Sequence, residues 1–254
     1  MSRPDAEGPG GQPADIQAVA RAAQILALFG PGTPEITAAG AASAIGLNRT
    51  TTYRYCTSLA SAGLLERRGE GSFAPGPLAL QLGVFALSRR EILDLAPPYM
   101  SELAAGTHST AVLSLWGSSG PVVSRVEEDA AGTVSVRVKV GTQLDLSSGQ
   151  AAVFLAFHRD QLLADRLIAT WPSDAQARLR ERLEGVQAGG YAAVDNGRGI
   201  AILAAPIFDE TGLCASMALL NTVQAMSLEP ESPQLRLLLS TARQLTAKMG
   251  GPSE

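Results

Sequence analysis

The stretch over residues 37–63, TAAGAASAIGLNRTTTYRYCTSLASAG, constrains this chain most, because it predicts two short helices joined by a glycine turn. Thr37 and Asn48 are residue types that cap the starts of helices, and Gly46 supplies the left-handed conformation that ends one. Two helices separated by such a turn indicate a helix-turn-helix. We expect the rest of the chain to support this unit, to bring two copies of it together and to regulate it.

The second of these helices has two different faces when it is placed on a helical wheel. One face is expected to be buried and carries Thr52, Tyr55, Cys56, Leu59 and Ala62. The other carries hydroxyls and a guanidinium, which donate to phosphate oxygens and base edges: Thr50, Tyr53, Arg54, Thr57 and Ser61. An ordinary amphipathic helix with a hydrated polar face explains the same pattern, so the helix alone leaves both readings open.

The segment that follows, residues 64–73, is typical of two short strands around a glycine-containing turn. A hairpin after a helix-turn-helix is a wing, and Arg67 and Arg68 stand on it where they can reach phosphates. Between Arg49 and Phe73 there are four arginines against two glutamates, in a chain of net charge −4. This local excess is too small for electrostatics alone to identify a DNA-binding protein.

These residues, together with two further stretches, resemble a known family. Residues 21–29, the unit above and FAPGPLALQLG resemble the winged-helix end of the IclR family of bacterial transcription regulators. GGYAAVDNGRGIAILAAPIFDETG extends the resemblance over nearly the whole chain. The resemblance implies an α+β fold with an N-terminal winged helix-turn-helix domain, a linker helix and a C-terminal GAF- or PAS-like effector domain that contains an antiparallel sheet.

Composition and periodicity predict a corresponding division of the chain. With 254 residues, of which 46% are hydrophobic, the chain can bury the cores of two ordinary domains. We expect a disordered tail over 1–13, the winged helix-turn-helix domain over 14–77, a linker helix over 78–96 that ends before two prolines, and an effector-binding and oligomerisation domain over 97–254. About six strands, one of them over 134–140, alternate with helices in the last domain, which indicates an α+β sensor.

The predicted linker helix carries apolar residues that must be buried against something: Leu78, Leu82, Phe85, Leu93 and Leu95. A second copy of the helix is the simplest partner, and packing on its own chain is the alternative. In the family this region joins two subunits, so the resemblance implies a homodimer, or a tetramer built from it. Two recognition helices would then address two half-sites of double-stranded promoter DNA.

The sequence shows no constellation for catalysis or for a cofactor. His108 and His158 have no cysteine or glutamate at metal-ligand spacing, and GxSxG, P-loop and HExxH motifs are absent. Cys56 and Cys214 are expected to be free core side chains. We therefore expect no catalytic residue, metal or cofactor. Since no apolar run could span a bilayer or serve as a signal core, we expect a cytoplasmic protein without a membrane partner.

A ligand pocket is easier to support. Ser147, Ser148 and Gly149 stand at a predicted helix start, where free backbone N–H groups attract a carboxylate, although capping is an alternative use of the serines. The resemblance implies an effector cavity lined by Trp116, Ser147, Ser148, Gly149, Asp195, Ile200, Ile202, Leu219 and Asn221. Asp195 is alternatively a turn residue of DNGRG, and LSSGQA is shorter than the family's usual segment, LHATALGKA. Walls of this kind suit a small organic acid or an aromatic metabolite.

The sequence therefore predicts a dimeric transcription regulator, acting as a repressor, whose affinity for its promoter is controlled by a small organic acid or a related metabolite. The residues expected to contact DNA are Arg49, Thr50, Thr51, Tyr53, Arg54 and Thr57 of the recognition helix and Arg67 and Arg68 of the wing. Two alternatives from other classes remain: an enzyme that processes the small molecule, and a winged helix that contacts proteins.

Overall fold

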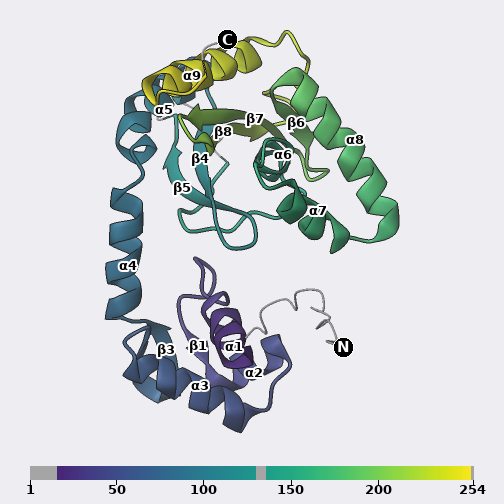
Figure 1. Cartoon of the computed structure of the whole chain (residues 1–254). Helices are drawn as coiled ribbons and strands as arrows, with labels where there is room; N and C mark the ends of the chain where they lie inside the picture. Colours follow the sequence, from purple (N-terminus) through teal and green to yellow (C-terminus); the bar gives the residue numbers. More distant parts are fainter. Residues whose placement is uncertain (1–15, 130–135, 253–254) are drawn as a thin grey trace, which may run out of the picture. The chain divides into compact units, whose positions relative to one another are not determined.

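A computed structural model describes residues 16–129 and 136–252 (Figure 1). The tail predicted over 1–13 lies outside these residues. The chain divides into two compact units, one reaching to Phe85 and the other starting at Ala86. Within the described part of the chain, no helix is both long enough and apolar enough to cross a membrane.

The N-terminal unit contains three helices and a small sheet, and it ends within α4 (Pro77–Ser88). Its helices are α1 (Gln17–Leu26), α2 (Ala38–Ile45) and α3 (Arg49–Ser61). Its strands are β1 (Ile36–Thr37), β2 (Leu65–Arg67) and β3 (Ser72–Pro75), with the short 3-10 helix η1 (Gly69–Gly71) between the last two. The strands pair antiparallel in the order β1-β3-β2. The predicted wing is thus confirmed, and β1 adds a strand that the sequence analysis did not include.

The helix-turn-helix is held by the caps that the sequence predicts. The Thr37 hydroxyl accepts a hydrogen bond from Gly40 N–H at 3.1 Å. The Asn48 side chain accepts one from Thr51 N–H at 2.7 Å. Gly46 ends α2 in the left-handed conformation, with φ of 69°. Each contact lies within a few residues along the chain, so local sequence determines where these helices begin and end.

The C-terminal unit is built on a five-stranded antiparallel sheet of order β5-β4-β8-β7-β6. The strands are β4 (Thr110–Trp116), β5 (Pro121–Glu127), β6 (Ala192–Asp195), β7 (Ile200–Asp209) and β8 (Gly212–Thr222). Helices α5 (Ile92–Thr107) and α9 (Pro233–Lys248) pack on one face, while α6 (Gly149–Ala156) and α8 (Ser173–Gly189) cover the other, with α7 (Gln161–Ala169) against α8 (Figure 1). The predicted α+β fold, with a helix-turn-helix unit followed by a sheet-based unit, is confirmed.

The region between the two units differs from the prediction at its prolines. Pro97 and Pro98 lie inside α5 and do not end a linker helix; the break falls earlier, between α4 (Pro77–Ser88) and Ile92. Pro97 has no N–H to offer the carbonyl of Leu93. This carbonyl accepts a hydrogen bond from Arg125 Nε of β5 instead, at 2.9 Å. A contact from a distant strand therefore supports Pro97 inside the helix.

The prediction of a sixth strand over 134–140 is wrong for residues 136–140, which the structure describes. Val136 to Lys139 form no strand, and residues 134–135 lie outside the described part. Residues 141–144 run beside β5 instead, with Val123 N–H donating to Thr142 O at 2.9 Å. The alternating valines of this segment are compatible with a strand and also with an irregular segment. The sequence pattern therefore could not show that residues 141–144, and not 134–140, run beside β5.

Candidate functional site

The inner face of α3 is anchored in the core of the N-terminal unit. Thr52 and Cys56 are fully buried and Leu59 is nearly so. The Thr52 hydroxyl donates to Asn48 O at 3.1 Å, so its buried oxygen is satisfied. Ala62 was predicted on this face, but it is exposed because α3 ends before it. The anchored face fixes which side chains of α3 point outward.

The outer face of α3 is exposed and polar. Arg49, Thr50, Tyr53 and Arg54 are exposed, while Thr51 and Thr57 are half-buried. Among residues 16–129 and 136–252, neither Arg49 nor Arg54 has a carboxylate within ion-pair distance. The structure therefore places Thr50, Tyr53, Arg54 and Thr57 on one surface, whereas Thr51 lies on the flank of α3 next to the buried face.

Arg67 of the wing lies across this surface. Its Nη1 donates to the Tyr53 hydroxyl at 3.2 Å and its Nη2 to the Thr57 hydroxyl at 3.1 Å. Its guanidinium carbon also lies 5.7 Å from the ring centroids of both Tyr53 and Phe73. Hydrogen bonding from Arg67, and its positive charge, lower the pKa of the Tyr53 phenol. Arg67 thus connects the wing to the recognition helix, a role that the sequence did not predict. Arg68 instead forms an ion pair with Glu66 of β2.

The start of α6 combines a cap with close packing. The Ser148 hydroxyl accepts from Ala151 N–H at 3.1 Å, so this serine caps the helix. The carbonyl of Ser147 accepts from Arg182 Nη1 at 2.9 Å. A methyl group on Gly149 would lie 3.2 Å from Cγ2 of Ile202, so the absent side chain lets α6 approach β7 closely. Ser147, Ser148, Gly149 and Ile202 therefore lie together.

Two predicted residues lie on the other side of the sheet. Leu219 belongs to the core under α5 and α9, whereas Ile202 contacts the core under α6 and α8. Asn221 also points away from α6, and its Nδ2 donates to His108 O at 2.8 Å. Because side chains alternate along a strand, the residue beside Ile202 on β8 is Leu220. Leu219 and Asn221 therefore do not share a sheet face with Ile202, whereas Leu220 does.

The loop before β7 is organised by asparagine and aspartate turns. Asp195 Oδ1 accepts from Gly197 N–H at 2.8 Å, and Asn196 Oδ1 accepts from Arg198 N–H at 2.8 Å. The exposed Asp195 is thus used as a turn residue, which was the alternative reading. Ile200 opens β7 directly after this loop and is half-buried.

Arg182 of α8 was missed by the sequence analysis. Its Nη1 binds the carbonyl at the start of α6, but its Nη2 is buried and has no hydrogen-bond partner in the described part of the chain. Burial lowers the pKa of this guanidinium. Buried polar groups are nearly always satisfied, so this nitrogen can donate to a water or to a ligand oxygen.

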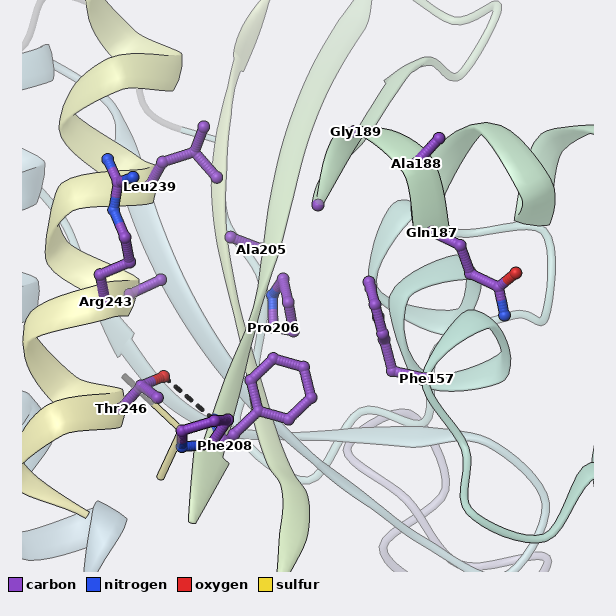
Figure 2. A pocket seen from close by; sticks show the side chains of 13 residues that line it. Phe157, Gln187, Ala188, Gly189, Ala205, Pro206, Phe208, Leu239, Arg243 and Thr246 are labelled. Carbon is purple, nitrogen blue, oxygen red and sulfur yellow. Dashed lines mark hydrogen bonds between the residues drawn. The ribbon is translucent and has the colours of Figure 1, made fainter. Parts of the chain in front are cut away.

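Figure 2 shows the lining of a cavity where β7 extends beyond the start of β6. The cavity has a volume of about 350 Å³. Leu239, Arg243 and Thr246 of α9 line one side, and Phe157 and Phe208 meet with ring centroids 5.6 Å apart. None of the predicted effector residues lines this cavity. Trp116 is separated from the others too, since it packs on the C-terminal half of α6, 5.4 Å from the Phe154 ring centroid.

Cys214 gives the C-terminal unit a pH dependence. Burial, and to a smaller extent the charge of Asp209, raise the pKa of its thiol to about 12 from an ordinary value of 9.0. Above pH 9 the unfolded chain loses this proton while the folded chain keeps it, so stability falls as pH rises. We expect the free energy of unfolding to fall by about 1.4 kcal/mol more between pH 8 and pH 10 than it does in Cys214→Ala. Urea unfolding of both proteins at the two pH values checks this, and identical pH dependence would contradict it.

No group of three or more histidine, cysteine, aspartate or glutamate side chains is placed to hold a metal ion within residues 16–129 and 136–252. Both cysteines are free.

Several proteins are similar to this chain in sequence or in structure. KipR, a helix-turn-helix transcriptional regulator of Bacillus subtilis, is 26% identical over 233 residues, which cover 85% of this chain and 91% of KipR. The crystal structure of an IclR transcriptional regulator from Silicibacter sp. TM1040 has a TM-score of 0.81 and 22% identity, over 93% of this chain and 98% of that one. An IclR homologue from Microbacterium hydrocarbonoxydans, solved with 4-hydroxybenzoate, has a TM-score of 0.68 and 19% identity, over 91% of this chain and 98% of that one.

Two family models match most of the chain. The IclR helix-turn-helix domain matches residues 18–69, which contain α1, α2 and α3. The C-terminal domain of bacterial IclR transcriptional regulators matches residues 84–247, nearly all of the sheet-based unit. The chain is a DNA-binding transcription regulator with a C-terminal effector domain, not an enzyme, and it belongs to the IclR family.

Proposed function

We propose that the chain is a homodimeric repressor that binds promoter DNA through α3 and the wing and releases it when a small organic acid binds the C-terminal unit. The observation that carries this proposal is the two-sided burial of α3. One face is locked into the core, and the opposite face exposes Thr50 and Arg54. Such groups donate to base edges and phosphates in a major groove. Because chromosomal DNA is the partner, we place the protein in the cytoplasm.

The dimer rests on α4. None of its residues is buried, although it carries large apolar side chains, among them Leu80 at 69% and Val84 at 59% exposure. Exposed apolar surface of this extent marks an interaction site, and a second α4 of the same kind is a matching cover. We keep residues 14–77 as the DNA-binding domain, 78–96 as the linker and 97–254 as the effector and oligomerisation domain, with a tetramer as a further assembly of dimers.

The effector site that we propose lies at Arg182 of α8, which lines a cavity of about 210 Å³ together with Val186, Tyr191 and Ala193. Arg182 supplies an unpartnered guanidinium nitrogen there, and the start of α6 lies beside it. A carboxylate oxygen would satisfy that nitrogen, which supports a small acid as the effector class. The 4-hydroxybenzoate bound by the Microbacterium homologue belongs to this class.

Release of DNA follows from linkage. If the acid binds one arrangement of the dimer more tightly than another, it lowers the affinity for DNA by the same factor by which DNA lowers the affinity for the acid. Repression is the sign that we propose, because an acid that releases a repressor requires no contact between the regulator and the polymerase.

Fluorescence anisotropy of labelled upstream DNA tests the effector site. We expect 4-hydroxybenzoate or another small acid to lower the DNA affinity at least tenfold, and Arg182→Gln to require at least tenfold more acid for the same release. Arg180→Gln, an exposed arginine on the same helix, is the matched control and should behave like the unchanged protein. If Arg182→Gln responds to the acid as the unchanged protein does, the acid does not bind at Arg182.

A further inference from the structure

A second cavity, of about 230 Å³, lies at the end of α6 that is remote from Ser148. Its lining comes from four places in the C-terminal unit: the joint before α5, the end of β4, the end of α6, and the turn between β7 and β8. All of these residues belong to the unit that starts at Ala86. The cavity therefore belongs to one compact body and does not depend on where the DNA-binding unit lies.

One wall of this cavity is aromatic. The Trp116 ring lies 5.4 Å from the Phe154 ring and 5.7 Å from the His158 ring, measured between centroids. Asp160 N–H donates to Nδ1 of His158 at 3.0 Å, which holds the imidazole in place. Phe154 is buried and Trp116 is half-buried, so the Trp116 ring is the one against which a planar ligand ring can stack.

The lining of the cavity also contains two cationic side chains. Arg90 and Arg159 both line it, and both are exposed. Within the described ranges 16–129 and 136–252, neither guanidinium has a carboxylate at ion-pair distance. Arg159 lies across Gly212, where an added Cβ would come within 2.5 Å of its Nε. The glycine thus makes room for the guanidinium beside the turn, and any side chain there would displace it.

One acidic group balances part of this charge. Asp209 Oδ1 accepts two hydrogen bonds from Thr211, from N–H at 2.6 Å and from the hydroxyl at 2.7 Å. Asp209 and Arg90 both influence the pKa of Cys214, in opposite directions, so both charges lie near that thiol. Two guanidinium groups against one carboxylate leave the cavity with one positive charge to be matched.

We propose that this cavity is a second ligand site of the C-terminal unit, which takes a small aromatic carboxylate. The ring stacks on Trp116, and the carboxylate pairs with the guanidinium groups of Arg90 and Arg159. A volume of about 230 Å³ is large enough for a single-ring acid. This site is separate from the one that contains Arg182.

The place of Arg90 gives such a site a regulatory consequence. Arg90 lies in the non-helical joint between α4 and α5, where residues 89–91 interrupt the helices. The joint connects the sheet-based unit to the helix that leads from the DNA-binding unit. A ligand that holds Arg90 against the β7–β8 turn fixes the joint in one conformation. The ligand thereby acts on the connection itself and not on the sheet.

Binding of benzoate without DNA tests the proposal, because this measurement does not depend on the regulator role. Isothermal titration of the full chain should show benzoate binding, with benzamide and acetate each at least tenfold weaker, since one lacks the charge and the other the ring. In an Arg182→Gln background, which removes binding at the first effector site, Arg90→Gln and Arg159→Gln should each weaken benzoate at least tenfold. Arg243→Gln, which alters an exposed arginine at the cavity in Figure 2, should leave benzoate binding unchanged.

Three results would overturn the proposal: no benzoate binding at 10 mM, unchanged affinity in both Arg90→Gln and Arg159→Gln, or loss of binding in Arg182→Gln alone. The last result would place benzoate at the first effector site. Circular dichroism establishes that each variant is folded. If Arg159→Gln unfolds, Arg159→Lys replaces it, and retained binding by Arg159→Lys together with loss in Arg90→Gln supports the site, whereas retained binding in both contradicts it.

Discussion

The double variant Thr50→Ala, Arg54→Ala is expected to bind the upstream DNA of its own gene about 10- to 100-fold more weakly than the unchanged protein does. Both side chains are exposed on the outer face of α3. Loss of a side-chain contact to a base edge costs about 1–3 kcal/mol. Alanine has a high helix propensity, so α3 itself should remain stable. Anisotropy titrations at one fixed salt concentration measure the effect, because contacts to phosphates vary steeply with salt.

A matched control separates this effect from a simple loss of charge. Arg180→Ala also removes one exposed arginine, from α8 in the other unit, and should change the DNA affinity by less than about twofold. Circular dichroism of both proteins shows whether they are folded. If the folded double variant binds DNA as tightly as the unchanged protein, the outer face of α3 is not the DNA surface, and a protein-contact role for the winged helix gains support.

Replacing two apolar residues of α4 by glutamate is expected to dissociate the dimer into monomers. Each monomer can then bind only one half-site, so we expect the promoter affinity to fall about 100-fold or more. Leu80 and Val84 share one face of α4, and Leu82 and Phe85 share the other. We therefore expect either Leu80→Glu, Val84→Glu or Leu82→Glu, Phe85→Glu to dissociate the dimer. Light scattering coupled to size exclusion gives the mass, and anisotropy gives the affinity.

The same helix offers a control for the added charge. Gln81 is exposed and already polar, so Gln81→Glu should leave the mass of the assembly unchanged. If both double variants remain dimers, the chain pairs through another surface, and the exposed apolar side chains of α4 need a different partner.

The parts of this fold that local sequence determines were predicted closely. Thr37, Gly46 and Asn48 act within a few residues of themselves, so the ends of α2 and α3 follow from their neighbours. The buried face of α3 follows from helical periodicity for the same reason, and it differs only at Ala62, where the helix has already ended.

The parts that depend on distant contacts were not predicted. Pro97 stays inside α5 because Arg125, 32 positions from Leu93, supplies the missing donor. Leu219 and Leu220 are both apolar neighbours on β8, and only the pairing with β7 decides which one faces α6. In a strand that is covered on both faces, apolar residues occur at every position, so the sequence carries no alternation to fix the register.

The candidate sites show the same division. The polar face of α3 lies within one helix and could be found from the sequence. Arg182 and Arg159 could not, because what distinguishes them is a buried nitrogen without a partner in one case and a place across Gly212 in the other. In the sequence, the neighbours of Arg182 and Arg159 do not distinguish either residue from an ordinary surface arginine. A site whose residues come from several helices and strands leaves no motif in any one of them.

Whether this chain recognises a specific promoter is decided by titrating the unchanged protein against its own upstream DNA, at two salt concentrations and with an excess of unrelated competitor DNA. A specific regulator gives saturable binding that survives the competitor and weakens as salt rises. We predict this result, with protein in the nanomolar to low micromolar range. Binding that the competitor abolishes, or no binding at micromolar protein with and without small aromatic acids, would contradict the proposed role of α3 and the wing.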